Sequence, residues 1–230
     1  MKLYYDIHIH SAASHCGDKN MRPNAIALTA KKNGLDVISV VDHVSGANLK
    51  AAANAAKKFG LLFLPGIEVT TKKGIHMLCY FKSLKTALEF STFIYDGLPD
   101  VKNNVSEWGH QYIIDENDDI VGEIEKGLSQ YTPHDVWQLI GLVESYGGLI
   151  VPAHINRDTH GLLLFHNDIS KFGFNTVEIK KTFSIDKKHL QKTKVIYNSD
   201  AHVLNNIAKK THYIEVNEKS IDAVFDYLKY

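Results

Sequence analysis

The chain opens with an alternation of apolar and polar positions that is typical of a β-strand. Apolar residues alternate with His8 and His10 along residues 4–10, and a strand turns alternate side chains to the same face. The two imidazoles are therefore predicted to lie about 7 Å apart on one face, where both could bind one metal ion. Two surface histidines opposite a buried face would give the same pattern, so the pair alone leaves both interpretations open.

Strand-like and helix-like segments then alternate over the first eighty residues. Pro23 suits the first turn of a helix, and Asn33-Gly34 suits its end. Continuous apolar runs indicate strands that are buried on both faces. The predicted segments are helices over 23–33 and 47–59 and strands over 36–41, 61–65 and 75–81. This order is typical of a barrel or open sheet with its site at the carboxyl ends of the strands.

Residues 83–130 interrupt the alternation. Residues 84–94 are amphipathic, and 111–121 suggest a β-hairpin around the acidic turn 115–119. That turn lacks the glycine and the terminal glutamate of a calcium loop, so a solvated turn is predicted. Because long excursions between regular elements often act as lids, we predict a lid-like insertion within a single domain that spans 1–230.

The alternation resumes in the last hundred residues. Thr132 is predicted as a helix N-cap with Pro133 in the first helical turn, and Gly147-Gly148 as the end of that helix. The further predicted elements are strands over 149–153, 176–179, 195–198 and 213–216, a helix-like stretch before residue 176, and a final helix from Ser220.

Composition narrows the class of protein. The chain has 230 residues, of which 44% are hydrophobic and 23% charged, as in ordinary globular proteins. The 26 Lys and Arg residues balance the 26 Asp and Glu residues, which argues against a dedicated nucleic-acid-binding protein, although a local basic patch would escape this count. Two cysteines make no disulfide framework. With no signal peptide or membrane span in the sequence, a cytoplasmic location is expected.

Imidazoles and carboxylates gather at the predicted strand ends. They are His8, His10, His43, Glu68, His76, His154, Asp200 and His202. Zn, Mn and Fe accept such ligands in hydrolytic sites. Each residue alone is more often a hydrogen-bonded polar group, but eight at the same end of successive strands predict a metal centre. No thiolate is expected among the ligands, because Cys79 lies in the body of a predicted strand.

Five motifs carry a resemblance to a known family. They are Asp6 to His10, Val41 to His43, Gly66 to Glu68 with His76, Pro152 to His154, and Asn198 to His202. In this order they resemble the small metal-dependent phosphoesterases of the PHP (polymerase and histidinol phosphatase) superfamily. The resemblance implies a distorted (β/α)7 barrel that holds two to three divalent ions, Mn, Fe or Zn, at its C-terminal face.

The resemblance also distributes the ligands over three metal sites. These would be His8, His10, Glu68 and Asp200 in the first site, Glu68, His76 and His154 in the second, and His43 and His202 in the third. The third site needs one more ligand from the loop 11–18, for which His15 fits best and Asp18 is the alternative. Asp42 is either a partner that orients a ligand or an ordinary strand-end group.

The chemistry expected of such a centre is phosphoester hydrolysis by a metal-activated hydroxide, without a covalent enzyme intermediate. Asp200 and Arg157 are the predicted catalytic residues. Arg157 is also predicted to bind substrate, because its guanidinium can hold two phosphate oxygens. A surface ion pair with Asp158 is the other interpretation of Arg157.

Three functions stay open at this point. The first is hydrolysis of a small phosphomonoester, such as a nucleotide or sugar phosphate. The second is a nuclease or phosphodiesterase that acts on nucleic acid, and the third is a metal-binding protein without catalysis. No membrane partner is expected, and the sequence leaves the exact substrate, the metal and the oligomeric state open.

Overall fold

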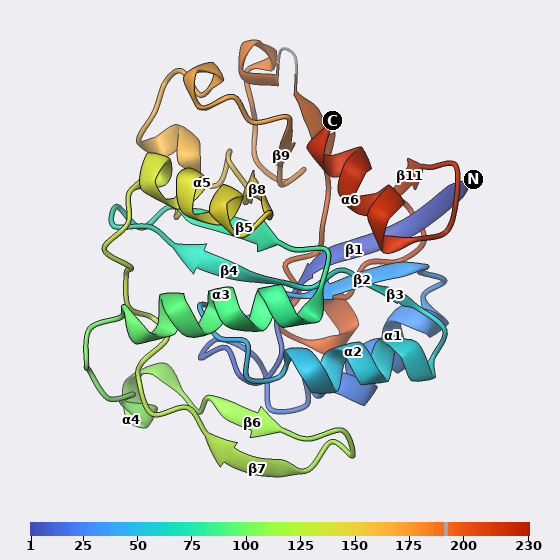
Figure 1. Ribbon diagram of the computed structural model, residues 1–230, viewed down its shortest axis with the longest axis vertical. Helices are drawn as coiled ribbons and strands as arrows, with labels where there is room; N and C mark the ends of the chain where they lie inside the picture. Colours follow the sequence, from blue (N-terminus) through green and yellow to red (C-terminus); the bar gives the residue numbers. More distant parts are fainter. Residues whose placement is uncertain (191–192) are drawn as a thin grey trace.

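The computed structural model describes residues 1–190 and 193–230. Its largest sheet has the strand order β11-β1-β2-β3. The strands are β1 (Lys2–Ile9), β2 (Val37–Val40), β3 (Leu62–Phe63) and β11 (Tyr213–Glu215). β1, β2 and β3 are parallel, and β11 is antiparallel to β1. The helices α1 (Pro23–Lys32) and α2 (Leu49–Lys58) lie together beside this sheet (Figure 1).

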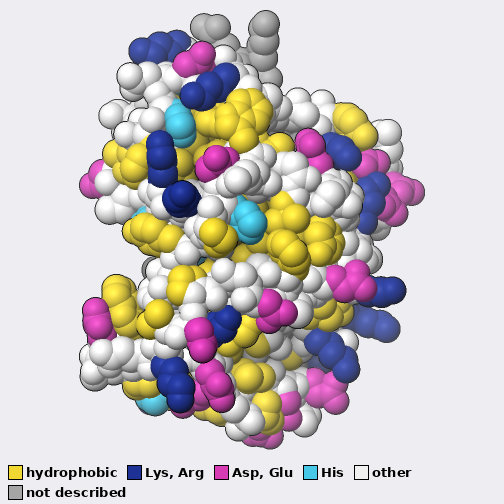
Figure 2. Space-filling model, turned by 60° about the vertical axis from the view of Figure 1, so that its left-hand side comes forward, with side chains coloured by type: hydrophobic (Ala, Val, Ile, Leu, Met, Phe, Trp, Pro, Cys, Tyr) yellow, Lys and Arg dark blue, Asp and Glu magenta, His cyan; other side chains and the backbone are white. Residues whose placement is uncertain are grey.

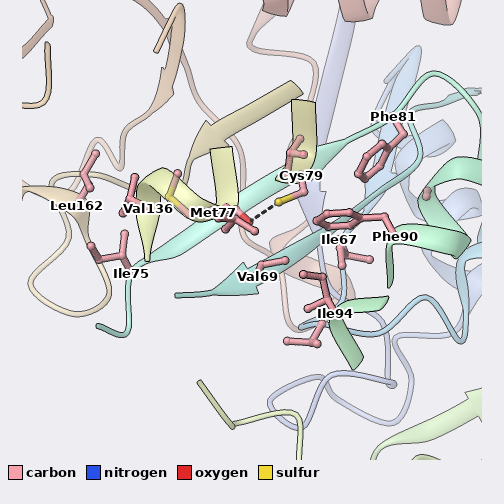
Figure 3. Close-up of a cluster of buried hydrophobic side chains, with 14 of the residues drawn as sticks. Ile67, Val69, Ile75, Met77, Cys79, Phe81, Phe90, Ile94, Val136 and Leu162 are labelled. Atoms are coloured by element: carbon pink, nitrogen blue, oxygen red, sulfur yellow. Dashed lines mark hydrogen bonds between the residues drawn. The ribbon is translucent and has the colours of Figure 1, made fainter. Parts of the chain in front are cut away.

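A second sheet contains β4 (Gly66–Thr70), β5 (His76–Tyr80) and β8 (Leu149–Pro152), all antiparallel to their neighbours. One face packs against α3 (Leu84–Asp96) and α5 (Val136–Ser145). Figure 3 shows Phe90 and Ile94 of α3 against Ile67 of β4. The other face packs against β1 and the C-terminal helix α6 (Ile221–Lys229). The second sheet therefore lies at the centre of the molecule, with core on both faces.

Smaller elements complete the fold. They are β9 (Thr176–Glu178) and β10 (Lys194–Ile196), which are parallel, α4 (Val105–Trp108), the hairpin β6 (Tyr112–Ile114) and β7 (Ile120–Glu123), and the 3-10 turns Leu162–Leu164, Ser170–Phe172, Lys187–Leu190 and Leu204–Asn206. Two isolated parallel bridges, Ile9 with Ala201 and His43 with Glu68, join segments that carry the predicted ligands.

The predicted strands at 36–41, 61–65 and 75–81 and the hairpin near 111–121 are confirmed in position. The predicted alternation of parallel strands is wrong at residues 66–80, because Gly66–Thr70 is a strand of its own that runs antiparallel to β5. The connection over residues 71–75 is too short for the crossover that parallel strands need. In the described part of the chain the strands form separate sheets, so the fold is mixed α/β and the closed (β/α)7 barrel is not confirmed.

Two helix predictions need correction as well. The helix predicted from Thr132 begins instead at Val136, and Asp135 forms its capping box with Gln138, while Thr132 donates its side-chain and backbone hydrogens to the Thr70 carbonyl. The helix-like stretch before residue 176 contains two 3-10 turns. No helix of the described residues is long and apolar enough to cross a membrane.

Candidate metal centre

The eight predicted ligands converge from three sheets. His8 lies on β1 and His10 directly follows it, while His43 follows β2. Glu68 lies within β4 and His76 opens β5, and because these strands are antiparallel both residues reach the same place. His154 follows β8, and Asp200 and His202 follow β10. The strand pairing thus assembles the site, although His76 stands at the start of its strand and not at the predicted carboxyl end.

Three of these side chains surround one point, and Glu68 lies beside them. The Nε2 atoms of His8 and His10 are 3.2 Å apart, and the Asp200 Oδ1 lies 3.3 and 3.4 Å from them. The two oxygens of Glu68 lie 3.4 Å from the first nitrogen and 3.3 Å from the second. The three atoms of His8, His10 and Asp200 form a triangle with edges of 3.2–3.4 Å. In a tetrahedral site with bonds of about 2.0 Å, the length of a zinc–ligand bond, neighbouring ligand atoms lie about 3.3 Å apart. The atoms therefore fit a bound cation of that size.

Glu68 connects this group to the other histidines. Its Oε1 lies 3.0 Å from the His76 Nδ1 and 3.6 Å from the His154 Nε2, and its Oε2 lies 3.3 Å from the His43 Nδ1. Among the described residues, neither Glu68 oxygen nor either ring nitrogen of His154 has a hydrogen-bond partner, and all are buried. Buried polar atoms without partners are costly, so this donor set fits a bound cation, and Glu68 would be one of the residues that hold it.

The charges of the cluster support this assignment. Burial alone would raise the pKa of Glu68, but His76, His8 and His43 hold it well below its usual value. Burial likewise opposes ionisation of Asp200, and the positive field of His8 and His10 lowers the pKa of that carboxyl. Both carboxylates are therefore ionised at neutral pH and are available as ligands.

Further side chains fix the rings in place. Glu178, which is not among the ligands predicted from the sequence, is fully buried, and its oxygens accept from the His8 Nδ1 at 2.9 and 3.1 Å. The His10 Nδ1 donates to the Ser14 Oγ at 3.0 Å, and Ser14 donates to Asp42. Each contact occupies Nδ1 and leaves Nε2 for a metal. Asp42 thus acts on a ligand through Ser14.

The backbone is strained at two ligands. His154 has a φ of 28° and Asp200 a φ of 55°, a region that residues other than glycine adopt rarely. Such strain persists only where the surrounding structure imposes it, and it is common at functional sites. The observation supports a functional role for both residues.

A third group of ligand atoms differs from the expectation. The Cys16 Sγ and one nitrogen each of His10, His43 and His202 all lie within 4.8 Å of one another. His15 stacks on His43 with ring centroids 5.1 Å apart and meets the Trp108 ring edge-on, but it is not part of that group. Asp18 is exposed, and its carboxylate accepts from the Asn20 backbone. Cys16 is not among the metal ligands predicted from the sequence.

Two basic side chains lie on the far side of the Asp200 carboxylate. The Asp200 Oδ2 is 3.2 Å from the Arg157 Nη1 and 3.4 Å from the Lys180 Nζ. Arg157 therefore contacts Asp200, which turns its other oxygen to the histidines. Lys180 is not among the site residues predicted from the sequence. Both basic groups are partly exposed, so a phosphate at the centre could contact them.

No family model matches the chain. It is 34% identical over 81 residues to a 5'-3' exoribonuclease of Haemophilus influenzae, a match that covers 34% of this chain and 28% of that protein. Endonuclease Q of Pyrococcus furiosus has a similar structure, with a TM-score of 0.73 and 19% identity over 100% of this chain and 56% of that one.

A two-domain protein of Bacteroides vulgatus that contains a predicted PHP-like metal-dependent phosphoesterase also aligns with 100% of this chain and 63% of its own, with a TM-score of 0.59 and 17% identity. The chain has a PHP-like fold. It spans about half to two thirds of these two structures, so the activities of the whole proteins do not transfer with the fold.

Proposed function

We propose that this PHP-like chain is a metal-dependent phosphoester hydrolase. The observation that carries the proposal is the convergence of two ionised, buried carboxylates, Glu68 and Asp200, with imidazole nitrogens 3.0–3.6 Å away. Divalent cations at such a centre lower the pKa of water and neutralise charge on a phosphoryl group.

In this proposal the residues have three roles: they bind the cations, orient the ligands and bind the phosphate. Glu68, Asp200 and the histidines hold the cations, and Glu178 and Ser14 keep His8 and His10 in the correct orientation. Arg157 and Lys180 bind the non-bridging phosphate oxygens, since both reach the edge of the centre beside Asp200. Fixed cationic groups at that position stabilise the negative charge that grows on the phosphate.

A small phosphomonoester is the first candidate substrate. The balanced charge of the chain supports it. Figure 2 shows one face of the molecule on which Lys and Arg side chains are interspersed with Asp and Glu side chains. Such a face offers no extended basic track for a long polyanion.

Nucleic acid is the second candidate, and a local feature favours it. A cavity of about 250 Å³ beside the centre is lined by Lys180, Lys181, Lys209 and His212, and no carboxylate is among its described lining residues. Lys180 lines this cavity and also contacts Asp200. A strand whose scissile phosphate lies at the metals could place a neighbouring phosphate there. The likeness to endonuclease Q and to the exoribonuclease supports the same candidate.

One assay tests the proposal and separates the candidates. The protein is stripped with EDTA and reloaded separately with Mn, Fe or Zn. It is then given a panel of phosphomonoesters and end-labelled single-stranded RNA and DNA. Turnover that EDTA abolishes supports hydrolysis, and the substrate that turns over identifies the class. No turnover of any ester with any metal would overturn the proposal.

A further inference from the structure

The loop that follows β1 brings the Cys16 sulfur to the metal centre. Gly17 makes this path possible, because a Cβ at that position would lie 2.2 Å from the Ser11 carbonyl oxygen. The Gly17 N–H also donates to the Ser14 carbonyl, which closes the turn. The chain therefore passes tightly over Ser11 and directs Cys16 towards His10, His43 and His202.

Independent features of the imidazoles point to a ligand at this place. The His43 side chain is almost fully buried, and its Nδ1 has no hydrogen-bond partner among the described residues. The His202 Nδ1 donates to the Asp200 carbonyl at 2.8 Å, which leaves the His202 Nε2 free. A cation between these rings and the sulfur would bind one nitrogen of each ring.

We propose that Cys16 is a thiolate ligand of a metal ion held with His43 and His202, at the edge of the centre assigned under the proposed function. Zinc binds sulfur at about 2.3 Å and imidazole nitrogen at about 2.0–2.1 Å, which sets tetrahedral ligand atoms about 3.5 Å apart. The atoms at Cys16, His43 and His202 lie within 4.8 Å of one another, so closing on an ion requires a shift of at most about 1 Å. His15 and Asp18 then have other roles: His15 packs between His43 and Trp108, and Asp18 closes the surface turn.

The consequence is a difference in metal preference within one centre. Thiolate is a softer donor than carboxylate and favours zinc or iron over manganese. The site of His8, His10 and Asp200 has only nitrogen and oxygen donors. We therefore expect the Cys16 site to keep zinc under conditions in which manganese occupies the other sites.

Cobalt substitution gives a readout that does not depend on turnover. The wild-type protein reloaded with Co(II) is expected to show a near-ultraviolet thiolate-to-cobalt charge-transfer band, and Cys16→Ser is expected to lose both the band and one equivalent of bound metal. Two matched variants should keep both. Cys79→Ala removes the other cysteine, which is fully buried in the core, and His15→Ala removes the alternative ligand. A band that persists in Cys16→Ser, or one that His15→Ala loses while Cys16→Ser keeps it, would overturn the proposal.

A second measurement needs no variant. X-ray absorption at the zinc edge of the zinc-loaded wild-type protein should contain a metal–sulfur distance of about 2.3 Å. Only nitrogen and oxygen scatterers in a protein with three bound zinc ions would overturn the proposal. If the protein binds cobalt and zinc in this way but hydrolyses no ester, the proposed function fails while the Cys16 assignment stands.

Discussion

Glu178 shows how much the candidate centre depends on a residue outside the predicted ligand set. It accepts from the His8 Nδ1, from the His154 backbone N–H at 3.1 Å and from the Asn198 side chain at 2.7 Å. One buried carboxylate therefore fixes three segments. Burial alone would raise its pKa, but His8 lowers that pKa, so Glu178 stays ionised and holds the His8 tautomer.

Glu178→Gln should weaken metal binding without unfolding the protein. The amide keeps the shape but is a poorer acceptor for the His8 Nδ1–H, and loss of such an orienting partner costs roughly 10–100-fold in metal affinity. Metal titration followed by calorimetry checks this, and excess metal should restore turnover. Glu89→Gln, on the exposed side of α3, is the matched control. Equal affinities in Glu178→Gln and wild type would contradict the role.

The imidazoles of His8 and His10 give the metal-free protein a definite pH dependence. Burial alone would lower their pKa values, but Glu178 and the other carboxylates raise that of His8 well above its usual value, and the Asp200 and Glu68 carboxylates, 3.4 and 3.3 Å from the His10 Nε2, raise that of His10 to about 9. The usual value in an unfolded chain is about 6.5. Raised folded-state pKa values stabilise the fold fully below pH about 6.5, and this stabilisation is lost as the pH rises towards 9.

We therefore expect the Tm of EDTA-treated protein to fall between pH 6.5 and 9. His15, His43, His76 and His202 have lowered pKa values and stay neutral in this range. They oppose the trend only while the unfolded chain still binds protons, up to about pH 7.5. The Tm of the metal-loaded protein should fall less over this range, because bound cations replace the protons on His8 and His10. Differential scanning calorimetry at both pH values measures the effect. A constant or rising Tm of the metal-free protein would show that His8 and His10 are not protonated in the fold.

At the scale of elements, α3 supports the sheet that carries Glu68. Phe90 is fully buried, with ring centroids 4.8 Å from Phe81 and 5.4 Å from Tyr146. Phe90→Ala should lower the free energy of unfolding by about 3–5 kcal/mol. Phe93→Ala changes a residue on the same helix that is 46% exposed, so it should lower the free energy of unfolding much less. Urea unfolding measures the free energy of unfolding of both variants. Equal losses of that free energy would contradict the role of Phe90 in the packing.

The convergence of the predicted ligands could be predicted from the sequence because it depends on local order. His8 and His10 share a strand face, and His154 and Asp200 follow strands that their apolar runs reveal. Glu178 could not be predicted in this way, since a single glutamate in a short strand resembles any polar strand end. The sequence marks Glu178 only as a polar residue between two apolar ones, Val177 and Ile179, which are both buried.

The directions of the strands could not be predicted from the sequence for a different reason. Apolar runs do not encode strand direction, and the direction of β4 and β5 follows from a short turn in which Gly74 has a φ of 80°. The interpretation of residues 83–130 as a lid remains a prediction. In that segment α4 brings Trp108 to His15, and the backbone N–H of Tyr112 donates to the Ala12 carbonyl.

At the scale of the whole molecule, the neutral net charge does not reveal a cavity that is locally basic. The chain is neutral, yet Lys180, Lys181 and Lys209 gather beside the centre. If nucleic acid is the substrate, Lys181→Glu should raise the KM for an oligonucleotide and reduce the salt slope of binding by about one. Lys85→Glu, which is highly exposed on α3, is the control. Identical salt slopes for Lys181→Glu and Lys85→Glu would show that no phosphate binds in the cavity.

The most direct test of the metal centre compares wild type with Glu68→Gln. Both proteins are reloaded with zinc or manganese, and bound metal and ester hydrolysis are measured on the same samples. Because Glu68 lies between His8, His76, His43 and His154, we expect the variant to lose bound metal from more than one site and to lose turnover with it. A folded Glu68→Gln protein that keeps its full metal content and full turnover would contradict the proposed centre.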